Sequence, residues 1–121
     1  MTKDLNKIHI NEILKDLCNY RTVDTFMVSI DGHKSIQYSR FEYLLSVLSD
    51  AEFIQHLDSP YPNLRAYSFW ALVRRNPPNV ESHLCKLSND SKTILFSDGC
   101  ITRQLKLSQF AIHIILYEQG L

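Results

Sequence analysis

Residues 53–72 read FIQHLDSPYPNLRAYSFWAL and decide the fold more than any other stretch of the chain. Two prolines in the middle of this stretch stop a helix that ends near Leu57, because proline cannot continue a helix. A second helix then begins close to Asn63 and runs to about Arg75, before a pair of prolines. This helix is apolar almost all round. That pattern is typical of a helix covered on both sides, or of one that offers an apolar strip to a partner.

The chain on either side of this stretch also reads as helix. Apolar residues recur at helical spacing, and polar caps and glycines mark the ends. Ser39 and Glu42 have the spacing of a capping box, which predicts a helix that starts at Ser39, and Asp50 is predicted to cap the next helix. The predicted further helices cover about 11–20, 39–49, 50–57, 80–87, 92–100 and 107–118.

Residues 23–38 allow two interpretations. Apolar residues alternate with polar ones before Asp31 and Gly32, as they do in a β-hairpin. The same stretch also fits one face of a helix that ends at Gly32. We predict the helix, because the surrounding segments are helical. The residues on this helical face are Val23, Phe26, Met27 and Ile30.

Length and composition indicate an ordinary globular chain. It has 121 residues, of which 45% are hydrophobic and 21% charged. This is enough for one core and too little for two, since domains usually hold roughly 100 to 150 residues. We therefore predict a single all-α domain over residues 1–121, built from seven or eight short helices.

The chain aligns weakly with itself at an offset of 30 residues. Each unit would be a helix ending in leucine, a polar turn and a second helix that opens with an aliphatic residue. The second copy, residues 84–101, lacks the arginine of the first and contains Gly99. The aligned pairs are Ile54 with Leu84, Leu57 with Leu87, Ser59 with Asn89, Leu64 with Ile94 and Ala71 with Ile101.

Residues 53–72 resemble one HEAT-type repeat. The matching features are Leu57, the short turn with proline, Leu64-Arg65 at the start of the second helix and Ala71-Leu72 at its end. The resemblance implies a short curved α–α stack. It also implies a non-catalytic binding function, since HEAT-like proteins are mostly scaffolds and adaptors.

Charge and cysteine content exclude several classes of protein. Lys plus Arg (13) equals Asp plus Glu (13), so the excess of positive charge that collects a protein on nucleic acid is missing. Cys18, Cys85 and Cys100 are an odd set without a close pair, which is typical of reduced thiols in the cytoplasm. The longest apolar run, 110–117, is too short to span a bilayer, and no signal-peptide pattern precedes it. We expect a cytoplasmic protein that has no membrane segment.

The residue spacing predicts no catalysis. None of the five histidines lies three or four residues from another, so no metal site is expected. The three glycines are isolated, which excludes a phosphate-binding loop and gives no sign of a cofactor. Cys100 follows Asp98 and Gly99, but no base for a nucleophile is visible, and a small packing residue is the favoured interpretation. We predict that the chain is not an enzyme.

The expected function is the binding of one protein partner. Tyr61, Arg65 and Phe69 would supply the aromatic and arginine anchors that dominate interface energies. Arg74 and Arg75 could pair with an acidic partner, although cations in a last turn also offset the helix dipole. A second, acidic set consists of Glu42, Asp50 and Glu52.

Among particular roles, the chain is similar by type to small bacterial immunity proteins, which bind and block a cognate toxin domain. The similarity lies in size, helical character and the lack of a catalytic arrangement. One feature differs: immunity proteins against nucleases are often acidic, whereas this chain is neutral. One alternative is a scaffold or adaptor. The other is a nucleic-acid module that uses the basic half, residues 61–106, which carries Arg65, Arg74, Arg75, Lys86, Lys92, Arg103 and Lys106.

Overall fold

Helix α4 (Pro62–Arg75) is the centre of the fold. Proline fits the first turn of this helix, where the missing N–H would have no partner. The helix ends at Asn76, which adopts the left-handed conformation (φ 47°) before the two prolines. The helix predicted over about 63–75 is therefore confirmed.

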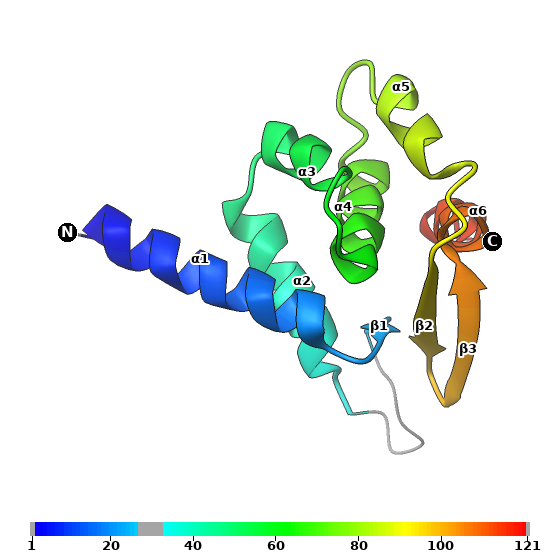
Figure 1. Cartoon of the computed structure of the whole chain (residues 1–121), viewed down its shortest axis with the longest axis horizontal. Coiled ribbons are helices and arrows are strands. Elements are labelled where there is room, and N and C mark those ends of the chain that lie inside the picture. The colour runs from blue at the N-terminus through cyan, green and yellow to red at the C-terminus, as the bar shows by residue number, and fades with distance from the viewer. Residues whose placement is uncertain (1, 27–32, 121) are drawn as a thin grey trace.

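The computed structural model describes residues 2–26 and 33–120 (Figure 1). In this part of the chain, α4 lies between α1 and α3 on one side and the sheet with α6 on the other. The other elements are α1 (Thr2–Asn19), β1 (Val23–Asp24), α2 (Ile36–Val47), α3 (Asp50–His56), α5 (Glu81–Leu84), the 3-10 turn η1 (Cys85–Leu87), β2 (Thr93–Asp98), β3 (Ile101–Lys106) and α6 (Leu107–Glu118).

The three strands form one mixed sheet in the order β1-β2-β3. Strands β2 and β3 are an antiparallel hairpin in which Phe96 lies opposite Arg103, and β1 pairs with β2 in parallel through Val23 and Phe96. The hairpin turns at Gly99, whose φ of +63° suits glycine far better than any other residue.

This sheet corrects the predicted fold class. The all-α prediction and the α–α stack are wrong, because the predicted helix 92–100 is strand β2 with its turn. In β2, Ile94 and Phe96 are buried while Thr93 and Asp98 at its ends are exposed, which suits a strand with one covered face. The glycine that interrupted the second repeat unit is the hairpin turn.

The segment 23–38 also differs from the prediction. Val23 and Asp24 are a strand and not the start of a helix, and the part of the predicted helix at 27–32 lies outside the described residues. Helix α2 begins at Ile36, because the Ser35 hydroxyl accepts a hydrogen bond from the Tyr38 N–H at 3.0 Å. The predicted start at Ser39 is thus one turn late.

Other helix boundaries vary in accuracy. Ser49, and not Asp50, caps α3, and it forms a capping box with Glu52. Helix α1 extends well before the predicted start at residue 11, whereas α6 covers 107–118 as predicted.

A buried polar cluster ties β1 to the helices. The Asp24 N–H donates to the Tyr67 hydroxyl at 2.7 Å, and that hydroxyl donates to the Asp24 carbonyl at 2.9 Å. The Asp24 carboxylate accepts hydrogen bonds from the hydroxyls of Thr22 and Ser35. Burial raises the pKa of Tyr67 well above its usual value, so the phenol stays protonated and can donate.

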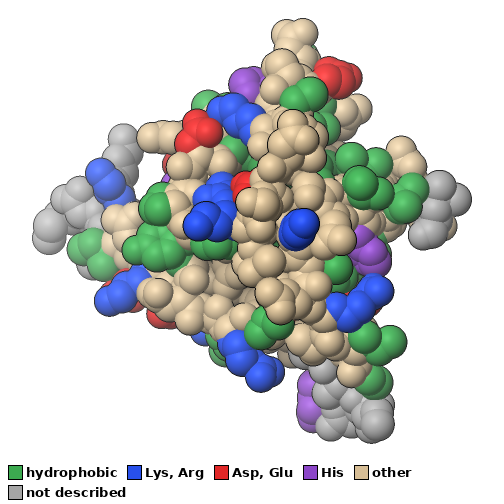
Figure 2. Space-filling view, turned by 45° about the vertical axis from the view of Figure 1, so that its right-hand side comes forward, with side chains coloured by type: hydrophobic (Ala, Val, Ile, Leu, Met, Phe, Trp, Pro, Cys, Tyr) green, Lys and Arg blue, Asp and Glu red, His purple; other side chains and the backbone are tan. Residues whose placement is uncertain are grey.

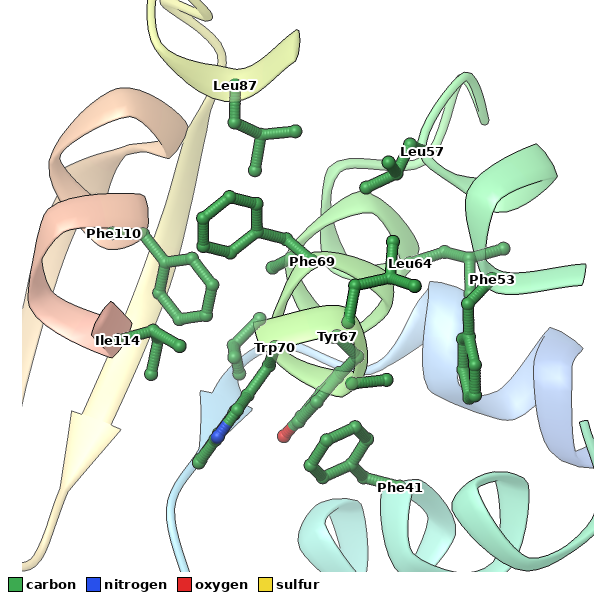
Figure 3. Close-up of a cluster of buried hydrophobic side chains, with 14 of the residues drawn as sticks. Phe41, Phe53, Leu57, Leu64, Tyr67, Phe69, Trp70, Leu87, Phe110 and Ile114 are labelled. Atoms are coloured by element: carbon green, nitrogen blue, oxygen red, sulfur yellow. The ribbon is translucent and has the colours of Figure 1, made fainter. Parts of the chain in front are cut away.

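The core is rich in aromatic rings that gather on α4 (Figure 3). The Trp70 ring is 0% exposed and lies 5.0 Å from the Phe41 ring and 6.4 Å from the Phe110 ring, centroid to centroid. Its Nε1–H donates to the Glu118 carboxylate at the end of α6. Trp70 therefore joins α2, α4 and α6.

Replacement of this ring tests the core. Trp70→Ala should lower the free energy of unfolding by about 3 to 5 kcal/mol, as other large-to-small core substitutions do. Urea denaturation checks this value, with Ile112→Ala, at a 64% exposed site, as the control. A loss below about 1 kcal/mol for Trp70→Ala would contradict the central position of the ring.

Gly99→Ala tests the hairpin turn. Apart from Gly99 and its two chain neighbours, no residue has an atom within 4 Å of a Cβ built at this position, so the cost should be conformational only, about 1 kcal/mol. Gly99→Asn should cost less, since asparagine tolerates the left-handed region better. Equal stability of the glycine and alanine proteins would mean that the turn does not have this conformation.

Candidate functional site

A large hollow lies between α1 and α3. Two adjoining hollows of about 590 and 680 Å³ share Leu14, Gln55 and His56, so they form one continuous depression, which we call the α1–α3 groove. Residues that line it are Asn6, Lys7, Ile10, Asn11, Leu14, Lys15, Cys18, Asn19, Leu48, Glu52, Gln55, His56, Asp58, Ser59, Pro60, Tyr61 and Leu64.

The groove exists because α1 and α3 pack on other helices. Helix α1 packs against α2 and α4, with Leu17 fully buried in that contact, whereas α3 packs on α4 through Phe53. The end of α1 is fixed by side-chain amides: Asn63 Nδ2 donates to the Tyr20 carbonyl at 2.7 Å, and Gln37 Nε2 donates to the Leu17 carbonyl at 3.0 Å. Side chains from α2 and α4 thus fix the C-terminal end of the α1 wall.

The groove has an apolar floor and a polar rim. Ile10, Leu14 and Cys18 recur every four residues on α1 and are half-buried, and Leu48 closes the floor on the other side. Tyr61, which is 49% exposed, stands at one end. An apolar depression with a polar rim is a common form of binding site.

Two titratable side chains that line the groove, Cys18 and His56, are uncharged at neutral pH. Burial raises the pKa of Cys18 to about 11 and so keeps the thiol protonated. Burial also lowers the pKa of His56, opposed by the charge of Glu52, so the imidazole is neutral. The pKa of Glu52 itself is lowered, chiefly by the hydrogen bond from the Ser49 backbone N–H, and this carboxylate stays ionised at the rim.

The structure separates the first group of predicted partner residues. Tyr61 lines the groove, but Phe69 is only 1% exposed and lies between Leu87 and Phe110 in the core (Figure 3). Arg65 holds the loop beneath Tyr61: it donates to the Ser59 carbonyl at 2.9 Å and pairs with a neighbouring carboxylate, Asp90, at 3.1 Å. Arg65 therefore supports the groove, and Phe69 supports the core.

The other two arginines predicted to bind a partner, Arg74 and Arg75, form ion pairs within the molecule. Arg74 pairs with Glu118 at 2.9 Å, and its guanidinium lies over the Trp70 ring. Arg75 pairs with Asp50 at 3.0 Å. Arg74 thus joins α4 to α6, and Arg75 joins α4 to α3.

The acidic set is not brought together as one surface either. Glu42 pairs with Lys34 at 2.6 Å, and Asp50 is bound to Arg75. Glu52 alone of these three carboxylates lines the α1–α3 groove. The structure therefore unites Glu52 and Tyr61, which the sequence had placed in different candidate surfaces.

Sequence reasoning missed the α1 wall and His56. The available signal was on α1, where Ile10, Leu14 and Cys18 form a second apolar row beside the row of Ile13 and Leu17. Leu17 is fully buried, whereas Ile10, Leu14 and Cys18 pack against the edge of the core and keep part of their surface exposed in the groove.

Within residues 2–26 and 33–120, no three His, Cys, Asp or Glu side chains are placed to hold a metal ion. None of the helices described there combines the length and the apolar character needed to cross a membrane. No protein-family model matches the chain, and neither a curated protein nor a solved structure was found to be similar to it.

The reaction rates of the three cysteine thiols test the environment of Cys18 in the groove. Cys85 and Cys100 are exposed, whereas Cys18 is half-buried with a pKa of about 11. Because the thiolate is the reacting species and Cys18 is partly buried, Cys18 should react with a disulfide reagent at pH 8 at least about ten-fold more slowly than the two exposed thiols. The slow phase should vanish in Cys18→Ser. Three thiols reacting at one common rate would contradict the described environment of Cys18.

Proposed function

We propose that this chain is a non-catalytic protein-binding domain whose partner occupies the α1–α3 groove. The observation that carries the proposal is the groove itself, an apolar depression with a polar rim, whose α1 wall is fixed at its C-terminal end by Asn63 and Gln37. A preformed surface binds more tightly, because less conformational freedom is lost on binding. Tyr61 at the end of the groove supplies an aromatic anchor.

Within this class, we propose that the partner is a toxin domain that the chain neutralises. The support is the similarity of type to small bacterial immunity proteins, together with the lack of any catalytic arrangement in the sequence. A scaffold or adaptor would use the same groove. The two roles differ in the effect of binding on the partner's activity.

The basic half of the chain gives little support to nucleic-acid binding. Arg65, Arg74, Arg75 and Lys86 pair with Asp90, Glu118, Asp50 and Asp58, which offsets their charge. On the face drawn in Figure 2, Lys and Arg side chains lie as separate groups with uncharged surface between them. Binding through phosphates favours clustered cations.

Photo-crosslinking in the native host tests the protein-binding proposal. A benzoylphenylalanine in place of Tyr61 should form an adduct with one protein, whereas the same group in place of Ile112 on α6 should not. Gln55→Trp should abolish the adduct by filling the groove from an exposed site, and Ser46→Trp, exposed on α2, should leave it intact. Identical adducts from both positions, or an adduct that survives Gln55→Trp, would contradict the proposal.

The toxin-neutralising role has its own test. Co-expression with the product of the adjacent gene should restore growth if that product is the toxin, and Gln55→Trp should remove the protection. A crosslinked partner whose activity is unchanged on binding would favour the adaptor role.

A further inference from the structure

Two rows of polar side chains flank the α1–α3 groove. On α1, residues 7, 11, 15 and 19 recur every four positions and read Lys-Asn-Lys-Asn. On the opposite wall, Glu52, Gln55 and Asp58 recur every three positions. The α1 residues share one face of that helix because they are four apart, whereas Glu52 and Gln55 lie on α3 and Asp58 lies in the turn that follows it. One wall of the groove is therefore cationic and the other anionic.

These charges remain available to a bound molecule. Lys7 and Lys15 are exposed and form no ion pair with any residue in the described part of the chain. The Asp58 side chain pairs with Lys86 at 3.1 Å, but it is 69% exposed, and such surface pairs contribute little. The Glu52 carboxylate stays ionised while it accepts the hydrogen bond from the Ser49 N–H in the capping box of α3.

The walls favour a helix as the occupant. The α1 wall and residues 52–56 of the opposite wall are helical, and the loop 58–61 uses its own N–H groups for bonds to Gln55, His56 and Ser59, so the groove offers no row of free backbone N–H groups to an extended strand. A helix satisfies its own backbone hydrogen bonds. The α1 wall from residue 7 to residue 19 is about 18 Å long, since a helix rises about 1.5 Å per residue, and this length matches three to four helical turns.

We propose that the groove binds an amphipathic helix of the partner protein, with an apolar stripe flanked by an acidic row on one side and a basic row on the other. The acidic row would face Lys7 and Lys15, and the basic row would face Glu52 and Asp58. The two rows match the walls in only one direction of the helix, so the charges also set its direction. This inference rests on the proposed protein-binding function.

Three synthetic helical peptides of about 14 residues, labelled with fluorescein, test the inference. All share one apolar stripe, and their flanks are acidic and basic, both acidic, or both basic. By fluorescence polarisation at low salt, the mixed peptide should bind at least about five-fold more tightly than the other two, because each of those places like charges along one wall. The difference should shrink in about 0.5 M salt, where exposed charges are screened.

Charge reversal of the α1 wall provides the matched variant. Lys7→Glu combined with Lys15→Glu makes both walls acidic and should transfer the preference to the peptide with two basic flanks. Lys92→Glu combined with Arg103→Glu, outside the groove, should leave the preference unchanged.

The outcomes separate this inference from the proposed function. Equal affinity of the three peptides would overturn the charge pattern, while binding in the groove would stand. Absence of binding by every peptide, with the Tyr61 crosslink intact, would show that the occupant is not a helix of this kind. Failure of the crosslink as well would remove the groove as the binding site.

Discussion

The burial of α4 is the constraint on which the rest of the structure depends. Its two largest side chains, Trp70 and Tyr67, each carry a polar group into the core, and a buried donor without a partner is costly. The Trp70 indole donates to Glu118 at the end of α6, and the Tyr67 hydroxyl exchanges hydrogen bonds with the backbone of Asp24 in β1. Satisfying these two groups therefore brings the C-terminal helix and the first strand, distant in sequence, to the same helix.

The enclosure of α4 also determines where the proposed binding surface lies. The apolar faces of α4 are used inside the molecule, so the proposed surface is built mainly from the elements around it. Helices α1 and α3 both rest on the core, and the space between them stays open as the groove. Arg65 links this space to the core, because it starts on α4 and holds the Ser59 carbonyl and Asp90 in place. The α1–α3 groove, which is the proposed binding surface, is thus a consequence of how α1 and α3 pack on the core.

The sequence predicts those elements whose ends are marked by local chemistry. Prolines before and after α4 and Gly120 after α6 are local signals for helix ends, and both helices were predicted closely. The hairpin 93–106 was missed, because a short apolar run fits a buried strand or a helix equally well and only pairing between strands decides. The start of α2 was missed because Ser35 and Ser39 can both cap, and Ser35 is held by the distant Asp24.

Prediction of the site was limited by the same cause. Tyr61 and Glu52 were identified as residue types that suit an interface, but the groove joins α1 to a helix about 40 residues further on, and no local pattern records that neighbourhood. The exposure of Phe69, Arg74 and Arg75 likewise depends on neighbours distant in sequence.

Native-state hydrogen exchange tests the central position of α4 most directly. The backbone amides of Tyr67 to Ala71 should exchange only by global unfolding, with an opening free energy equal to that from urea denaturation. Exchange of these amides through local openings, at a free energy well below the global value and independent of denaturant, would contradict the account.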